Sequence, residues 1–159
     1  MITYLTGDAS EPIGKRPCII THVVNDIGAW GAGFVLAVSK KYPRDHIVYK
    51  DWIRGESPYP YHERAKFGTI LPIQHEDGVT DVLLLAQSGV GGRPGAIPLS
   101  YWGLESALTY LAQYERGQPI HMPRIGCGLA GGTWDKVGPM VESILNRREV
   151  YVYDLPVNR

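Results

Sequence analysis

Residues 119–134 of the chain read Pro-Ile-His-Met-Pro-Arg-Ile-Gly-Cys-Gly-Leu-Ala-Gly-Gly-Thr-Trp. The run from Ile120 to Ile125 predicts a short buried strand, and a glycine-rich segment follows it directly. Thr133 is a suitable N-cap for a helix that begins near Trp134. This arrangement favours anion binding, because bare backbone N–H groups at a helix N-terminus can approach a phosphate closely. A tight structural turn that needs positive φ is the alternative interpretation.

Length and charge restrict the class of protein. A chain of 159 residues predicts one domain, residues 1–159, with a sizeable core. Sixteen basic and sixteen acidic residues cancel, so a nucleic-acid partner is not indicated. The apolar runs are too short to cross a bilayer, and no secretion signal is recognised at the N-terminus. Cys18 and Cys127 form neither a zinc pattern nor a disulfide framework. We therefore expect a cytoplasmic monomer without a membrane partner.

Hydrophobic patterning predicts strands that alternate with helices, which is typical of an α/β sandwich with a largely parallel sheet. Gly117 is expected to end the third helix, and Pro139 to bend or split the fourth. The predicted strands are 2–6, 18–24, 67–73, 82–86, 120–125 and 150–153, and the predicted helices are 34–41, 45–54, 98–116 and 134–147.

Four loops follow the carboxyl ends of predicted strands, at residues 7–8, 25–33, 87–92 and 126–132. In open α/β sheets this edge is where ligands bind. Because several of the loops are rich in glycine, we expect one elongated crevice that suits a ligand with two phosphates flanked by bulkier groups.

Three residues in the early loops have a functional and a structural interpretation. Asp8 can accept a hydrogen bond from an exocyclic amine such as that of adenine, or it can cap a turn. Asn25 can bond sugar hydroxyls, or close its own turn. Trp30 lies among glycines, where it can stack on a ligand ring or fold back on the core.

Three further residues carry the same ambiguity. Tyr153 can face adenine or belong to the core. Arg124 interrupts an apolar strand, so its guanidinium needs a partner, either a ligand anion or an internal acid. His22 can act as a general acid or base, or as a hydrogen-bonded core histidine. The motifs GxxxxGK[ST], HExxH and GxSxG are absent, and the glycines at 89–92 lack the full dinucleotide fingerprint, which disfavours a dehydrogenase.

Taken together, these stretches resemble the macrodomain family, which binds ADP-ribose. The matches lie at residues 7–8, 22–33, 122–132 and 152–155, in the family's order and over most of the chain. The branch most similar contains the terminal ADP-ribose protein glycohydrolases and some bacterial and phage relatives. The resemblance implies a three-layer α/β/α sandwich with a mixed, centrally parallel six-stranded sheet.

The resemblance also implies roles within the crevice. Asp8 would contact adenine with Tyr153 nearby, residues 126–132 the diphosphate, and residues 28–33 the distal ribose side. Metal and other cofactors are not expected, because the histidine–cysteine cluster of zinc-dependent relatives is not found in this sequence. The expected ligand-binding residues are Asp8, Ala9, Val24, Asn25, Gly28, Ala29, Trp30, Gly31, Ala32, Gly33, Gln87, Ile125, Gly126, Cys127, Gly128, Leu129, Ala130, Gly131, Gly132 and Tyr153.

The departures from the family pattern bear on mechanism. The glycohydrolase branch uses a lysine after the middle strand and an acid after the Gly-Cys-Gly-Leu run. Here these places hold Ser88 or Gly89, and Ala130, which disfavours a lysine-adduct mechanism.

The first hypothesis is therefore a hydrolase that removes mono-ADP-ribose from acidic protein side chains, using water oriented by the substrate diphosphate. Its partners would be ADP-ribose or ADP-ribosylated proteins. The alternatives are an ADP-ribose-1″-phosphate phosphatase that uses His22, and a module that binds ADP-ribose without turnover. The candidate catalytic residues are Asn25, Gln87, Arg124 and His22.

Overall fold

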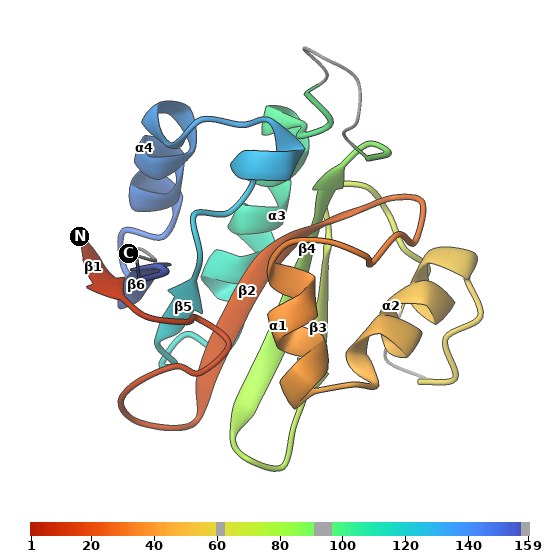
Figure 1. Ribbon diagram of the computed structural model, residues 1–159, viewed down its shortest axis with the longest axis horizontal. Coiled ribbons are helices and arrows are strands. Elements are labelled where there is room, and N and C mark those ends of the chain that lie inside the picture. The colour runs from red at the N-terminus through yellow and green to blue at the C-terminus, as the bar shows by residue number, and fades with distance from the viewer. Residues whose placement is uncertain (60–62, 91–96, 157–159) are drawn as a thin grey trace.

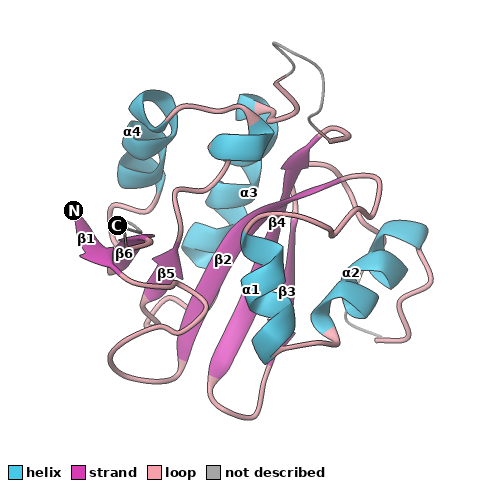
Figure 2. Cartoon of the chain, in the orientation of Figure 1, coloured by secondary structure: helices cyan, strands magenta, loops and turns pink. Residues whose placement is uncertain are grey.

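The computed structural model describes residues 1–59, 63–90 and 97–156 (Figure 1). Within them, six strands form one sheet in the order β1-β6-β5-β2-β4-β3, and helices cover it (Figure 2). The strands are β1 (Ile2–Thr6), β2 (Cys18–Asn25), β3 (Ile70–Gln74), β4 (Val79–Gln87), β5 (Ile120–Met122) and β6 (Val150–Asp154). The helices are α1 (Phe34–Lys41), α2 (Asp45–Arg54), α3 (Tyr101–Gln113), the short 3-10 helix η1 (Gly128–Ala130) and α4 (Trp134–Ile144).

The sheet is parallel except at one edge. β1, β6, β5, β2 and β4 pair in parallel with their neighbours, and β3 pairs antiparallel with β4. Because β-strands in a parallel arrangement share a carboxyl edge, the loops after β1, β2, β4, β5 and β6 all leave the same side of the sheet. The expected mixed, centrally parallel six-stranded sheet is confirmed.

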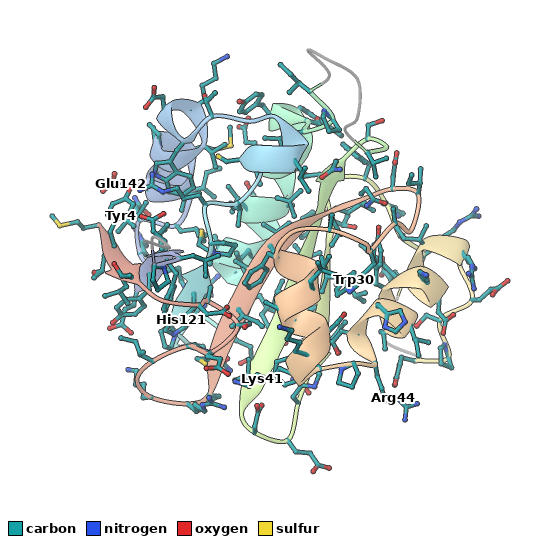
Figure 3. All side chains as sticks on the ribbon, in the orientation of Figure 1. Tyr4, Trp30, Lys41, Arg44, His121 and Glu142 are labelled. Carbon is teal, nitrogen blue, oxygen red and sulfur yellow. The ribbon has the colours of Figure 1, made fainter. Side chains whose placement is uncertain are left out.

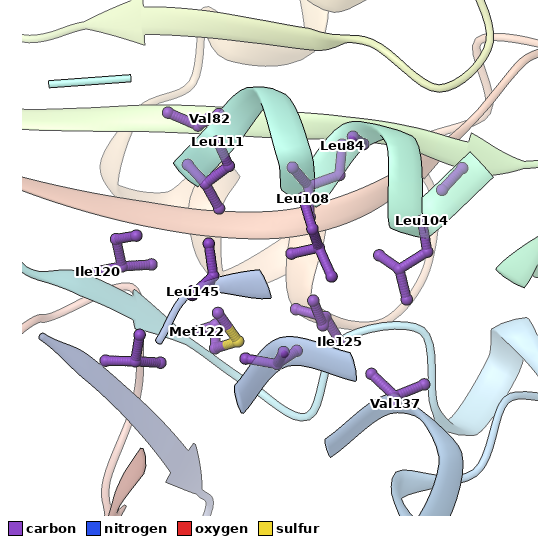
Figure 4. Packing of buried hydrophobic residues seen from close by; sticks show 14 of the residues in the cluster. Val82, Leu84, Leu104, Leu108, Leu111, Ile120, Met122, Ile125, Val137 and Leu145 are labelled. Carbon is purple, nitrogen blue, oxygen red and sulfur yellow. The ribbon is translucent and has the colours of Figure 1, made fainter. Parts of the chain in front are cut away.

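The two faces of the sheet bury separate clusters. Leu104, Leu108 and Val137 of α3 and α4 pack with Ile19 on one face (Figure 4). On the other face, Val38 of α1 packs in one cluster with Ile20, and Tyr49 of α2 packs in a second cluster with Leu83. Because successive side chains of a strand point to opposite faces, the continuous apolar run of β2 contributes side chains to the clusters on both faces of the sheet. The molecule is the expected α/β/α sandwich.

Several predicted boundaries are wrong by a few residues. α1 and α2 have the predicted bounds, but β3 begins at Ile70 because Gly68 has a φ of 83° and turns the chain before it. β4 begins at Val79, so the polar pair Thr80 and Asp81 belongs to a buried strand. β5 ends at Met122 because the following Pro123 has no N–H to continue the ladder.

The ends of the later helices also differ from the prediction. α3 begins after Ser100, whose hydroxyl accepts a hydrogen bond from the Gly103 N–H, and it ends at Gln113 instead of running to Gly117. α4 continues through Pro139 without splitting and ends at Ile144. Thr133 occupies the N-cap position as predicted, but its side chain makes no capping hydrogen bond. Within the described residues, none of the helices has the length and apolar character needed to span a membrane.

Candidate functional site

A cavity of about 680 Å³ lies at the carboxyl edge of the sheet. Its wall is formed by the segments that follow β1, β5 and β6, by residues near the carboxyl ends of β2, β4 and β6, and by the start of α1. Fourteen of the predicted site residues line it: Asp8, Ala9, His22, Ala32, Gly33, Gln87, Arg124, Ile125, Gly126, Cys127, Gly128, Leu129, Ala130 and Tyr153.

The glycine-rich segment after β5 forms one wall of the cavity. Gly126 and Gly128 have φ values of 70° and 74°, a region that side chains other than glycine rarely adopt. The N–H of Gly132 donates to the carbonyl of Gly126, and a Cβ at Gly132 would lie 2.4 Å from that oxygen. The sequence of glycines therefore permits a closely folded loop whose backbone is presented to the cavity.

The N-terminus of α1 forms the opposing wall. Its N-cap residue, Gly33, has a φ of 79° and makes no side-chain capping bond, and the first turn contains no acidic residue. Sequence reasoning missed that residues 34–37 line the cavity. Because the first N–H groups of a helix lack intrahelical partners, this end favours an anion. The glycine loop and the helix end together form a cradle whose polarity suits an anion.

At one end of the cavity, Asp8 and Tyr153 lie near Gly7. The Asp8 Oδ1 atom accepts hydrogen bonds from the backbone N–H and the hydroxyl of Ser10, so Asp8 closes its own turn while it lines the cavity. The Tyr153 ring lies 3.5 Å from the position of a Cβ built at Gly7. Its hydroxyl accepts from the Ile13 N–H and lies 2.7 Å from His121 Nδ1, so the ring alone faces the cavity.

His22 is the buried histidine of the cavity wall. Its Nε2 lies 2.9 Å from Asp81 Oδ1, and its ring makes edge contacts with Trp30 and Phe34. Its Nδ1 has no partner among the described residues. Sequence reasoning missed Asp81, because the predicted strand began one residue after it. The available signal was an isolated acid inside the apolar run 79–86.

Gln87 and Arg124 line the cavity in different ways. The Gln87 Nε2 group donates to the carbonyl of Gly89 at 2.9 Å. The Arg124 guanidinium makes two hydrogen bonds to Asp154, at 2.7 and 3.0 Å, and lies over the ring of Trp134. The hydrogen bond to Asp154 raises the pKa of Arg124 and lowers the pKa of Asp154. The partner of Arg124 is therefore an internal acid.

The remaining predicted site residues do not line the cavity: Val24, Asn25, Gly28, Ala29, Trp30, Gly31, Gly131 and Gly132. The Asn25 side chain instead holds its own loop, since Oδ1 accepts from the N–H groups of Ile27 and Ala29 and from the Tyr49 hydroxyl. Trp30 is folded back toward the core, where it lies between α1 and α2 and donates to the Ser39 hydroxyl (Figure 3).

Two further expectations concern thiol and metal chemistry. Burial raises the pKa of Cys127, which keeps its thiol protonated although the residue lines the cavity. In the described part of the chain, histidine, cysteine and acidic side chains do not gather in a group that could hold a metal ion. Residues 91 and 92 of the expected third loop lie outside the described residues.

Two solved structures are similar to this chain over nearly its whole length. A Bacteroides thetaiotaomicron protein of unknown function is 34% identical, with a TM-score of 0.86 and 98% of each chain covered. A macrodomain protein from Streptomyces coelicolor is 35% identical, with a TM-score of 0.79, over 97% of this chain and 99% of that one. The scan against family models found no match.

Three curated proteins are more distant relatives. Mouse chromodomain-helicase-DNA-binding protein 1-like is 26% identical over 98% of this chain, which spans only 18% of that protein. A Thermosipho africanus DNA ADP-ribosyl transferase–DNA ADP-ribosyl glycohydrolase fusion protein is 26% identical over 87% of this chain and 38% of its own length. An ADP-ribose 1″-phosphate phosphatase from Meyerozyma guilliermondii is 23% identical over 95% of each.

Proposed function

The chain belongs to the macrodomain family, and on that premise we propose that its cavity binds ADP-ribose and that the protein hydrolyses mono-ADP-ribose from acidic protein side chains. The observation that carries the proposal is the two-sided cradle, in which the N-terminus of α1 faces the glycine loop 126–132. The first N–H groups of α1, which lack intrahelical partners, and the positive end of its helix dipole suit a diphosphate. Two curated relatives, a glycohydrolase fusion and a phosphatase, are named for reactions on ADP-ribosyl groups.

The reaction would proceed by attack of water on the anomeric carbon of the distal ribose. A bond forms from the water oxygen to that carbon, and the bond to the protein carboxylate oxygen breaks. One proton stays on the new hydroxyl and the other passes to the medium. Because a carboxylate is a good leaving group, orientation of the water supplies much of the catalysis. We assign this role to Gln87, a polar side chain that lines the cavity, and not to Asn25, which does not line it.

A second function is favoured by one specific observation, the buried pair of His22 and Asp81 in the cavity wall. A histidine held through one ring nitrogen by a carboxylate is suited to proton transfer at the other nitrogen. In a phosphatase acting on ADP-ribose-1″-phosphate, His22 would serve as this group. The relative from Meyerozyma guilliermondii bears that activity in its name.

One experiment distinguishes these functions. The protein is incubated with a glutamate-linked mono-ADP-ribosylated protein, with ADP-ribose-1″-phosphate, and with an ADP-ribosylated DNA oligonucleotide, and products are followed by mass spectrometry. We expect free ADP-ribose from the first substrate, and slower release in Gln87→Ala. If only ADP-ribose-1″-phosphate gives product, the protein is a phosphatase. If only the DNA oligonucleotide gives product, the proposal that the substrate is an ADP-ribosylated protein is wrong. Calorimetric binding without any product would identify a binding module.

The proposed position of the diphosphate can be tested by introducing a negative charge into the glycine loop. A Cβ at Gly128 meets nothing within 4 Å, so a side chain fits there at the cost of its positive φ. We expect Gly128→Glu to weaken ADP-ribose binding by at least about tenfold, because the carboxylate repels the diphosphate. Gly128→Gln has the same shape and backbone strain without the charge, and it serves as the matched control. Equal affinities of the two variants, measured by calorimetry, would contradict the placement of the diphosphate.

A further inference from the structure

Four segments at the carboxyl edge of the sheet are bonded to one another in a ring (Figure 1). The Asp26 N–H donates to the Gln87 carbonyl, and Asp26 Oδ1 accepts from the Gly89 N–H. These two bonds join the loop after β2 to the loop after β4. The Ser88 N–H donates to the Pro98 carbonyl, which joins the loop after β4 to the segment before α3.

The ring is completed at the glycine loop. The Leu99 N–H donates to the Ala130 carbonyl, which joins the segment before α3 to η1. The Leu129 side chain reaches the N-cap of α1, because its Cδ1 atom lies 3.8 Å from the position of a Cβ built at Gly33. Gly33 ends the loop that begins after β2, so the chain itself closes the ring. Gly33, Gln87, Leu129 and Ala130 also line the cavity, and the ring therefore borders it.

Each of the four segments presents one exposed aliphatic side chain. Ile27, Val90, Ile97 and Leu129 are 60%, 55%, 61% and 67% exposed. Exposed apolar side chains that are scattered singly are normal, whereas several that gather on joined loops indicate an interaction surface. The backbone bonds of the ring hold these four side chains around one cavity. We call the four residues the apolar rim.

The segments of the rim also carry little charge. Their described residues are 26–37, 87–90, 97–100 and 126–133. Among these, Asp26 is the one acidic residue, and there is no lysine or arginine. Lys50 of α2 lies beside the first segment, with its Cγ atom 3.8 Å from a Cβ built at Gly28, and Arg93 lies outside the described residues. Because proteins hold DNA largely through several lysine and arginine contacts to phosphates, this surface suits an apolar polypeptide better.

We propose that the apolar rim binds the polypeptide of an ADP-ribosylated protein next to its modified residue, and that it favours apolar residues on either side of that residue. The inference rests on the proposed function, in which the protein is attached to the distal ribose near Gln87. Gln87 is bonded to the ring, so an attached polypeptide leaves the cavity across the rim. Burial of aliphatic side chains there is favourable, whereas polar flanking residues would lose water without gaining a partner.

The test is a calorimetric binding measurement with ligands that cannot be turned over. The ligands are free ADP-ribose and two peptides of equal length, each carrying ADP-ribose on one side chain through a non-hydrolysable linkage. Valine and leucine flank the modified residue in one peptide, and serine and asparagine flank it in the other. We expect the apolar-flanked peptide to bind about tenfold more tightly than free ADP-ribose, and the polar-flanked peptide to bind like free ADP-ribose.

A double variant, Ile27→Ser with Ile97→Ser, removes two side chains of the rim that do not line the cavity. It should lose the preference for the apolar-flanked peptide and keep the affinity of the parent protein for free ADP-ribose, which shows that the variant is folded. Ile47→Ser is the matched control, because Ile47 is also exposed but lies on α2 outside the rim. This control should keep the preference.

Two outcomes would overturn the inference alone while free ADP-ribose still binds. One is equal affinity of the parent protein for the two peptides, and the other is a double variant that keeps the full preference. Tighter binding of an ADP-ribosylated DNA oligonucleotide than of either peptide would assign the rim to nucleic acid and would also contradict the inference. If free ADP-ribose does not bind the parent protein, the proposed function is wrong, and the inference that rests on it is wrong as well.

Discussion

At the scale of single residues, His121 makes stability depend on pH. Burial lowers its pKa to about 4, so the ring is neutral, and its Nδ1 lies within hydrogen-bond distance of the Tyr153 hydroxyl, at 2.7 Å. In the unfolded chain a histidine binds a proton near pH 6.5. Between these values the unfolded state therefore binds more protons, and the free energy of unfolding falls as the pH drops from 6.5 to 4, by up to about 1.4 kcal/mol per pH unit.

We expect His121→Phe to reduce this slope while lowering stability at neutral pH through loss of the hydrogen bond to Tyr153. Urea unfolding at several pH values between 4.5 and 7 measures both effects. His46→Gln changes a partly exposed histidine and should leave the slope close to that of the parent protein. If the unfolding free energy of His121→Phe depends on pH as steeply as that of the parent protein, another group causes the loss of stability at low pH.

At the scale of elements, Arg148 closes the end of α3. The residue is 7% exposed, and its guanidinium donates to five backbone carbonyls, those of Leu111, Ala112, Tyr114, Glu115 and Gln118. These include carbonyls at the C-terminus of the helix, which have no intrahelical partner. The helix was expected to end at Gly117. Instead, Arg148, which lies in the segment before β6, donates the hydrogen bonds that satisfy the carbonyls at the helix end.

Arg148→Lys is therefore not conservative, since an ammonium cannot reach all five acceptors with the fixed geometry of a guanidinium. We expect a loss of about 3 kcal/mol in the free energy of unfolding, because buried carbonyls are left unsatisfied. Denaturant titration measures it. Arg147→Lys changes the exposed neighbour and should have almost no effect. Equal stability of the two variants would contradict the assigned role of Arg148.

The glycine loop gives a second prediction at this scale. Gly132→Ala places a Cβ 2.4 Å from the Gly126 carbonyl oxygen, whereas Gly128→Ala meets no atom within 4 Å and bears only backbone strain of about 1–2 kcal/mol. We expect a larger fall in melting temperature for Gly132→Ala than for Gly128→Ala. The reverse order would indicate that the loop is not folded on Gly126 as described.

At the scale of the whole molecule, a ligand that binds only the folded state should stabilise it. With ADP-ribose at a hundred times its dissociation constant, the gain is about 2.7 kcal/mol, which corresponds to a rise of about 5–10 °C in melting temperature for a domain of this size. Gly128→Glu should show little of this rise at the same concentration. A thermal shift that is identical in the variant would mean that ADP-ribose binds away from the glycine loop.

Local sequence patterns correctly predicted the order of strands and helices, the bounds of α1 and α2, and the glycine loop after β5. These features are local, because hydrophobic periodicity and the φ values open to glycine act over a few residues. The convergence of the loops followed from the parallel sheet, since all carboxyl ends meet at one edge. Membership of the family was also readable from these stretches, and the similarity to a solved macrodomain confirms it.

Which polar side chains contact one another could not be predicted from these local patterns. Sequence patterns left open whether His22 faces a ligand or a partner, and the pairing of Ile20 with Asp81 in the sheet brings that acid to it. Arg124 likewise has two possible partners in the sequence and meets Asp154, 30 residues away. Such contacts depend on strand register and on the packing of helices over the sheet, which bring together residues that no local pattern relates.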